Sequence, residues 1–157
     1  MEYPSCTCAK CIEACQCHPG WFSPIEAEKA IDEGYARMLM LDFLGDSTSN
    51  PIVYVLSPAS LNYEGKCAPT MPSSWVLRIG WVRGPCVFLT EEGRCTIHNT
   101  DFKPIECKKA YLCAPLSDAE IDKEHMSVAR MWLSPRGKKV IERWKKEVDF
   151  KPPKKHI

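Results

Sequence analysis

The sequence predicts a small, irregular α+β domain that consists mostly of helices and includes a short β-hairpin. Two capping boxes, Ser23–Glu26 and Ser117–Glu120, predict the starts of two helices, and the pair Ser134-Pro135 predicts the start of a third. The run Ile52–Leu56 is rich in β-branched and aromatic residues and predicts a strand. Helices are therefore expected to contain more of the chain than strands do.

The three predicted helices are amphipathic. The first is expected over about 24 to 36, with an extension to Leu44 left open, and the other two follow their own capping serines. On the third helix the lysines and the arginine are expected to face solvent. The predicted buried faces are, in chain order, Ile25, Ala30, Ile31, Tyr35 and Met38; Ile121, Val128, Ala129 and Trp132; and Val140, Ile141 and Trp144.

Further β segments are predicted between the first two helices. Residues 75 to 82 predict a strand, and residues 86–90 and 94–97 flank Glu91-Glu92-Gly93, a pattern typical of a short hairpin with glycine at a left-handed turn position. Because each flanking segment carries a cysteine, this hairpin is expected to bring Cys86 and Cys95 near each other.

Length and composition limit the classes of protein that fit. With 157 residues, one domain with a small core is expected over 1–150, followed by a basic tail over 151–157. Hydrophobic residues make up 45% and charged residues 26%, which indicates a globular chain. No apolar stretch approaches the roughly 20 residues that a membrane-spanning helix needs, so no membrane partner is expected.

The charge balance and the first residues bear on partners and compartment. The formal net charge is +1, from 21 basic and 20 acidic residues, and gives no global attraction to nucleic acid. The first ten residues contain no basic and apolar pattern of a secretion signal. A cytoplasmic location with reduced thiols is therefore expected.

Ten cysteines are the strongest chemical signal in the chain. Five lie within the first seventeen residues, in a segment called the head below (residues 1–19), and five lie between residues 67 and 113. The spacing C-x2-C-x3-C in the head allows several sulfurs to reach one ion or cluster, and zinc or iron, including an iron–sulfur cluster, is the expected cofactor. The predicted metal ligands are Cys8, Cys11, Cys15, Cys86, Cys95, Cys107 and Cys113.

These thiols could have roles other than metal binding. Any one cysteine can be a core residue, and Cys6 and Cys67 fit that role best. A redox dithiol at Cys8 and Cys11 requires a strand before the motif, which the sequence does not show. Five disulfides require an oxidising compartment. Metal binding is therefore the preferred interpretation, with one site or two left open.

The downstream cysteines also carry a family resemblance. The segment Cys86–His98 contains C-V-F-L and G-R-C-T-I-H, Lys103–Cys107 contains K-P-I-E-C, and Cys113 follows. In this order, behind an N-terminal cysteine cluster, these elements resemble the zinc- or iron-chelating CxxCxxCC domain family. The resemblance implies chelation of zinc or iron, in a family most of whose members have no assigned activity. The head departs from the name-giving pattern because it has C-x2-C-x3-C in place of C-x2-C-x2-C-C.

The expected function is metal binding with a chiefly structural role, because a closed site of four thiolates has no open position for a substrate. An iron–sulfur oxidoreductase or protein-modifying enzyme is one alternative, and a zinc-dependent nucleic-acid-binding module is another. Catalytic residues are not predicted, whether the chain is an enzyme is left open, and a protein partner would suit an interaction module.

Several other side chains have secondary expectations. His18, beside Cys17, and His98 could complete a metal site, whereas His125 and His156 are expected to have ordinary surface roles. The five tryptophans are expected to fill a small core, and Glu26 to act as a capping residue. Four basic residues could offset thiolate charge, bind an anionic partner or remain solvated, with solvation favoured over nucleic-acid contact: Arg94, Lys103, Lys108 and Lys109.

Overall fold

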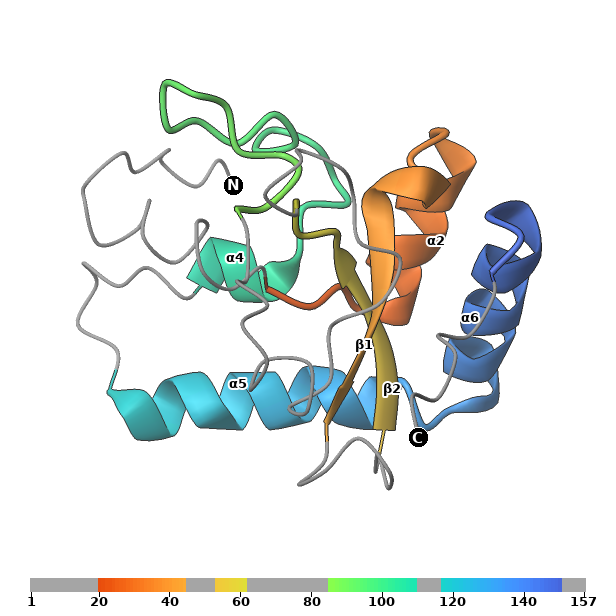
Figure 1. Ribbon diagram of the computed structural model, residues 1–157. Coiled ribbons are helices and arrows are strands. Elements are labelled where there is room, and N and C mark those ends of the chain that lie inside the picture. Colours follow the sequence, from red (N-terminus) through yellow and green to blue (C-terminus); the bar gives the residue numbers. More distant parts are fainter. Residues whose placement is uncertain (1–19, 45–52, 62–84, 110–116, 151–157) are drawn as a thin grey trace, which may run out of the picture.

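The computed structural model describes residues 20–44, 53–61, 85–109 and 117–150 (Figure 1). The strand predicted over residues 75 to 82 and the tail over 151–157 lie outside these residues. Four of the predicted metal ligands also lie outside them, namely Cys8, Cys11, Cys15 and Cys113.

Three helices begin where the sequence predicts: α2 (Pro24–Asp32), α5 (Asp118–Met131) and α6 (Pro135–Glu147). Before each helix a serine hydroxyl accepts a hydrogen bond from a backbone N–H of the first turn. In α2 and α5 a glutamate carboxylate also accepts the N–H of that serine, so both capping boxes are confirmed. The serines are Ser23, Ser117 and Ser134, and the glutamates are Glu26 and Glu120.

The sheet has two antiparallel strands, β1 (Leu39–Leu44) and β2 (Val53–Pro58). Leu39 lies opposite Pro58 and Leu44 opposite Val53. The strand predicted at residues 52–56 is confirmed by β2. Helices α2, α5 and α6 all contact β2, and Figure 1 shows α2 and α6 on one side of the sheet with α4 (Ile105–Lys109) on the other. The α+β class is confirmed.

The extension of the first helix to Leu44 is wrong. The helix ends at Asp32, and Gly34 follows with a φ of 90°, a left-handed conformation that glycine adopts without steric cost. A 3-10 turn, η1 (Ala36–Met38), then leads into β1. The apolar residues after Gly34 are buried as a strand against β2, so long-range pairing decides their conformation.

The predicted hairpin around Gly93 is reduced to a turn closed by one bridge pair. Gly93 has a φ of 80°, as expected, and Leu89 pairs with Cys95. The chain turns again directly after Cys95, where the N–H of His98 donates to the Cys95 carbonyl, and the hairpin arms go no further. Cys86 pairs with Ser60, so the bridge of the hairpin does not include Cys86. That the two thiols lie near each other stays a prediction.

Aromatic residues fill the core, as predicted for the three tryptophans that the structure describes. Trp21, Trp132 and Trp144 are all buried. The Trp132 indole N–H donates to the Phe22 carbonyl at 2.7 Å and the Trp144 indole N–H to the Ala36 carbonyl at 2.8 Å, so burial leaves neither donor unsatisfied.

Most of the predicted buried faces are confirmed. The buried positions are Ala30, Ile31, Val128, Ala129, Trp132, Val140, Ile141 and Trp144, and Tyr35 is half-buried. Ile25 and Met38 are exceptions, with 49% and 37% of their surface exposed. Ile25 lies in the first turn of α2 on its outer side, and Met38 follows the end of the helix, so neither belongs to its inner face.

Candidate functional site

Helix α4 carries Cys107, one of the predicted ligands. The side chain is half-buried, and its sulfur lies beside Gly20: a Cβ placed on Gly20 would be only 2.7 Å from Cys107 Sγ. Gly20 directly follows the head, three residues after Cys17. The position at which the head joins the described fold is therefore packed against a candidate metal ligand.

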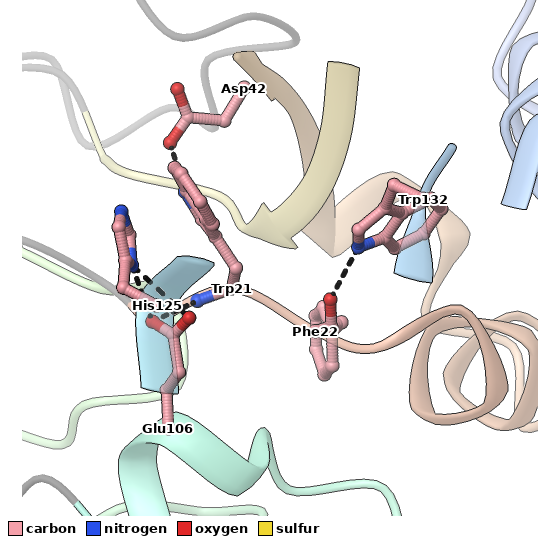
Figure 2. Close-up of polar contacts among 6 residues, drawn as sticks. All are labelled: Trp21, Phe22, Asp42, Glu106, His125 and Trp132. Carbon is pink, nitrogen blue, oxygen red and sulfur yellow. Dashed lines mark hydrogen bonds and ion pairs between the residues drawn. The ribbon is translucent and has the colours of Figure 1, made fainter. Parts of the chain in front are cut away.

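The Glu106 carboxylate joins three segments of the chain beside Cys107. Its Oε1 accepts the backbone N–H of Trp21 at 3.3 Å, and its two oxygens lie 3.1 and 3.2 Å from Nδ1 of His125 on α5 (Figure 2). Glu106 is only 8% exposed. Because a buried carboxylate is costly without donors, these contacts fix α4 against both the start of the described chain and α5.

The Trp21 side chain extends this arrangement to the sheet. Its indole N–H donates to Asp42 Oδ2 on β1 at 2.7 Å, and Asp42 Oδ1 accepts the N–H of Phe43 at 2.7 Å. The Trp21 ring also stacks on the His125 imidazole, with 3.5 Å between ring centroids and 27° between planes. Trp21, Asp42, Glu106 and His125 are called the Trp21 network below (Figure 2).

The Trp21 network corrects one expectation and was not foreseen as a whole. His125 was expected to have an ordinary surface role, yet its side chain is only 28% exposed, stacks on Trp21 and faces Glu106. Glu106 and Asp42 showed no sequence signal, because their partners are separated from them by 19 to 85 residues. Helix α4 did carry a local signal: Pro104 lies just before it and an acidic residue occupies its first turn.

Glu26 provides a second tie to α4. Besides its capping bond to Ser23, the carboxylate accepts the backbone N–H of Ile105 at 2.9 Å through Oε2. Burial raises the pKa of Glu26, while the hydrogen bonds from Ser23 and Ile105 act in the opposite direction. The expected capping role is confirmed, and the same side chain also anchors the first residue of α4.

Cys86 and Cys95 lie at bridge pairs. Cys86 is 8% exposed, within the core, and Cys95 is half-buried against it. Among the described cysteines, no disulfide joins Cys86, Cys95 and Cys107 to one another. Ser60, the bridge partner of Cys86, has a buried hydroxyl that finds no hydrogen-bond partner in the described part of the chain. The side chains of directly opposed residues lie on the same face of a strand pair. The Ser60 hydroxyl and the Cys86 thiol therefore lie on the same face.

Lys103 departs from the favoured expectation of a solvated loop charge. It is 6% exposed, and its ammonium lies 2.6 Å from Nδ1 of the half-buried His98. The described residues offer this ammonium no carboxylate. A buried cation without an anionic partner is costly, so a negatively charged thiolate centre nearby would suit it. Of the other basic residues grouped with it, Arg94 is exposed and Lys108 half-buried.

The described residues alone do not assemble a metal site. In residues 20–44, 53–61, 85–109 and 117–150, no three His, Cys, Asp or Glu side chains come together as ligands of one ion. Three groups are compatible with a thiolate centre: the Cys107 sulfur beside Gly20, the buried Lys103 ammonium, and the Ser60 hydroxyl on the same face as Cys86.

No helix in the described ranges has the length and apolar character needed to cross a membrane. Comparisons of the chain with protein-family models, with curated proteins and with solved structures found no match. The resemblance to the CxxCxxCC domain family therefore stays a prediction from the sequence motifs.

Proposed function

We propose that this chain binds zinc or iron, the latter including an iron–sulfur cluster, through cysteine thiolates of the head and of residues 86–113, and that the centre is chiefly structural. The observation that carries the proposal is the contact of the Cys107 sulfur with Gly20, the residue that directly follows the head. Ligands distant in sequence must converge to close such a site, and this contact supports their convergence.

Chain length makes this convergence accessible to the nearest head cysteines. An extended chain spans at most about 3.6 Å per residue, so Cys17 lies within about 11 Å of Gly20 and Cys15 within about 18 Å. Chain length therefore allows both sulfurs to approach Cys107.

Electrostatics supports the same proposal. A zinc ion with four thiolates carries a formal charge of about −2. The buried Lys103 ammonium would offset part of this charge, and a thiolate at Cys86 would accept a hydrogen bond from the Ser60 hydroxyl. In both cases the centre would satisfy a buried polar group that the described residues leave poorly satisfied.

A structural role suits the size of the fold. A two-stranded sheet is marginal without further packing, and a small domain buries a limited apolar surface. Metal binding to thiolates contributes folding free energy directly. A reducing compartment such as the cytoplasm would keep these thiols in the form that binds metal.

Elemental analysis combined with a visible spectrum of anaerobically purified protein tests the proposal. Colourless protein with about one or two zinc ions per chain supports a zinc centre. Brown protein with acid-labile sulfide and absorbance near roughly 400 nm supports a cluster and favours the iron–sulfur enzyme as the role to examine next. Protein without bound metal, with its thiols free or oxidised to disulfides, would contradict the proposal.

A further inference from the structure

We propose that the outer face of α6 binds the phosphate backbone of a double-stranded nucleic acid through Lys138, Lys139 and Lys146. The inference goes beyond the proposed function, and none of these residues belongs to the predicted metal ligands. Three features of α6 support it: a concentration of positive charge, three exposed lysines without a carboxylate partner in the described part of the chain, and an outer face without apolar anchors.

Positive charge is concentrated in α6. The helix contains six basic and two acidic residues, whereas the whole chain contains 21 basic and 20 acidic residues. The rest of the chain therefore has more acidic than basic side chains. Because such a remainder repels a polyanion and α6 attracts it, the charge distribution favours the approach of a polyanion to this helix.

Packing leaves the lysines of α6 exposed. The helix packs on α2 and β2, and its inner side, which includes Ile141 and Trp144, is buried. Lys138, Lys139 and Lys146 are exposed, and Figure 1 shows α6 at the edge of the described fold. Lys139 and Lys146 are seven residues apart, so they lie on the same side of the helix, about 10.5 Å from each other along its axis.

Ion pairs engage only three of the six basic residues of α6. The pairs are Arg136 with Glu28, Arg143 with Asp32 and Glu147, and Lys145 with Glu142. Within the described ranges, no carboxylate pairs with Lys138, Lys139 or Lys146. These three ammonium groups are therefore available to an anion that approaches from outside.

The three lysines border an open hollow on the surface of α6. It has a volume of about 470 Å³, which is room for a phosphate group, and is lined by Lys138, Lys139, Glu142, Arg143, Lys146 and Glu147. Lys138 and Lys146 are eight residues apart, about 12 Å along the helix axis, whereas a duplex carries one negative charge per about 1.7 Å of its axis. Several phosphates therefore come within reach of the three lysines when a duplex lies along α6.

The chemistry of this face favours a nucleic acid over a membrane or a protein. A helix that binds at a membrane surface inserts apolar side chains, and hot spots of protein interfaces are mostly large aromatic or arginine anchors in desolvated pockets. The large exposed hydrophobic residues of the described chain all lie outside α6. Phosphate contacts require only positive charge and hydrogen-bond donors, which the lysine ammonium groups provide.

A duplex suits the face better than a single strand does. Proteins that bind single strands usually stack the unpaired bases on exposed aromatic side chains. Trp144, the only aromatic residue of α6, is buried. The exposed lysines can contact phosphates but offer no surface on which bases could stack.

Fluorescence anisotropy of a labelled DNA duplex of about 20 bp, titrated with the full chain at several salt concentrations, tests the inference. Three phosphate contacts predict that the logarithm of the association constant falls against the logarithm of the salt concentration with a slope of about −2.7. Duplexes of unrelated sequence should bind alike, since lysine–phosphate contacts do not read bases. An RNA duplex of the same length should also bind, and the tighter of the two identifies the source of the phosphates.

Substitution of the three lysines assigns the binding to α6. The triple variant Lys138→Gln, Lys139→Gln and Lys146→Gln is expected to bind the duplex at least about tenfold more weakly at low salt and to lose most of the salt dependence. Each single variant should reduce the steepness of the slope by about 1. Because all three positions are exposed, circular dichroism should show the wild-type fold.

A matched control separates α6 from net charge. The triple variant Arg37→Gln, Arg94→Gln and Lys123→Gln removes the same charge from exposed positions outside α6 and should keep the wild-type slope. Equal losses in both triple variants, or a wild-type slope near zero, would overturn the inference. Binding to phosphatidylserine vesicles or to polyglutamate, without binding to either duplex, would overturn it as well. Neither triple variant changes a predicted metal ligand, so the metal content tests the proposed function separately.

Discussion

Trp21 is held by polar contacts at both its backbone and its side chain. Its backbone N–H donates to Glu106, its indole N–H donates to Asp42, and its ring stacks on His125. The partners come from α4, β1 and α5, so one residue next to the head links three elements of the fold. Sequence reasoning predicted its burial from its apolar character but had no means of predicting these partners.

Trp21→Phe should destabilise the fold by about 1–3 kcal/mol, because the buried Asp42 carboxylate then has one donor fewer. The loss should be smaller in an Asp42→Asn background, since a neutral amide is less costly to bury than a carboxylate. Chemical denaturation of the wild type, the two single variants and the double variant measures this coupling. Strictly additive effects would show that the indole N–H does not stabilise the carboxylate.

The pH dependence of stability should carry a contribution from Glu26. Burial raises its pKa above the ordinary value of 4.5, so the folded chain holds this proton more tightly than the unfolded chain does. The stabilising contribution is complete below pH 4.5 and is lost as the pH rises through the raised folded-state pKa. The stability of the wild type relative to Glu26→Gln should therefore decline from pH 4 towards pH 7. A difference that grows with pH would contradict this direction.

At the scale of elements, the two capping boxes allow a matched comparison. Glu120 caps α5 at an exposed position, whereas the buried Glu26 caps α2 and also binds the Ile105 N–H of α4. Glu120→Ala should cost about 1 kcal/mol, as capping substitutions do. Glu26→Ala should cost about 1–3 kcal/mol more, because it also leaves a partly buried N–H unsatisfied. Equal losses in thermal or chemical denaturation would show that the tie to α4 contributes nothing.

Local chemistry explains which elements the sequence could predict. The starts of α2, α5 and α6 depend on serine and proline within a few residues, and they were predicted correctly. The sequence leaves open a helical extension over the residues of β1, because their apolar side chains fit either periodicity and only pairing with β2 decides between them. The hairpin predicted around Gly93 is longer than the observed one, because the second turn, after Cys95, has no strong sequence signal.

In the candidate site, too, features that depend on neighbouring residues were predicted, whereas contacts between residues distant in sequence were not. The spacing of the head cysteines is a local pattern that predicts metal ligands. The capping role of Glu26 is likewise predicted locally, from the capping box Ser23–Glu26. The contact between Cys107 and Gly20 and the pairing of Glu106 with His125 depend on how α4 and α5 pack. No spacing in the chain encodes those contacts, so His125 was assigned to the surface.

At the scale of the whole molecule, the described elements form a limited core. The buried apolar surface comes from three tryptophans, the two-stranded sheet, the inner faces of α2, α5 and α6, and loop residues that include Phe88, Ile97 and Phe102. The ion pairs that join α2 to its neighbours are exposed, including Lys29 with Asp101 and Arg136 with Glu28, and such pairs contribute little. A metal centre that joins the head to α4 would therefore add a substantial part of the stability.

Removal of the metal should unfold the chain or lower its melting temperature by well over about 10 °C, because a ligand that binds only the folded state stabilises it by mass action. Circular dichroism before and after treatment with a chelator measures the change, and readdition of the metal should reverse it. A melting temperature that stays constant after complete loss of metal would mean that the centre is not structural.

The most direct test of the central claim, that Cys107 and the head share one metal centre, is the metal content per chain of Cys107→Ser. Cys67→Ser is the control, since Cys67 lies outside the predicted ligand set. The account predicts that Cys107→Ser loses metal while Cys67→Ser retains the wild-type amount. A wild-type metal content in folded Cys107→Ser protein would contradict the claim.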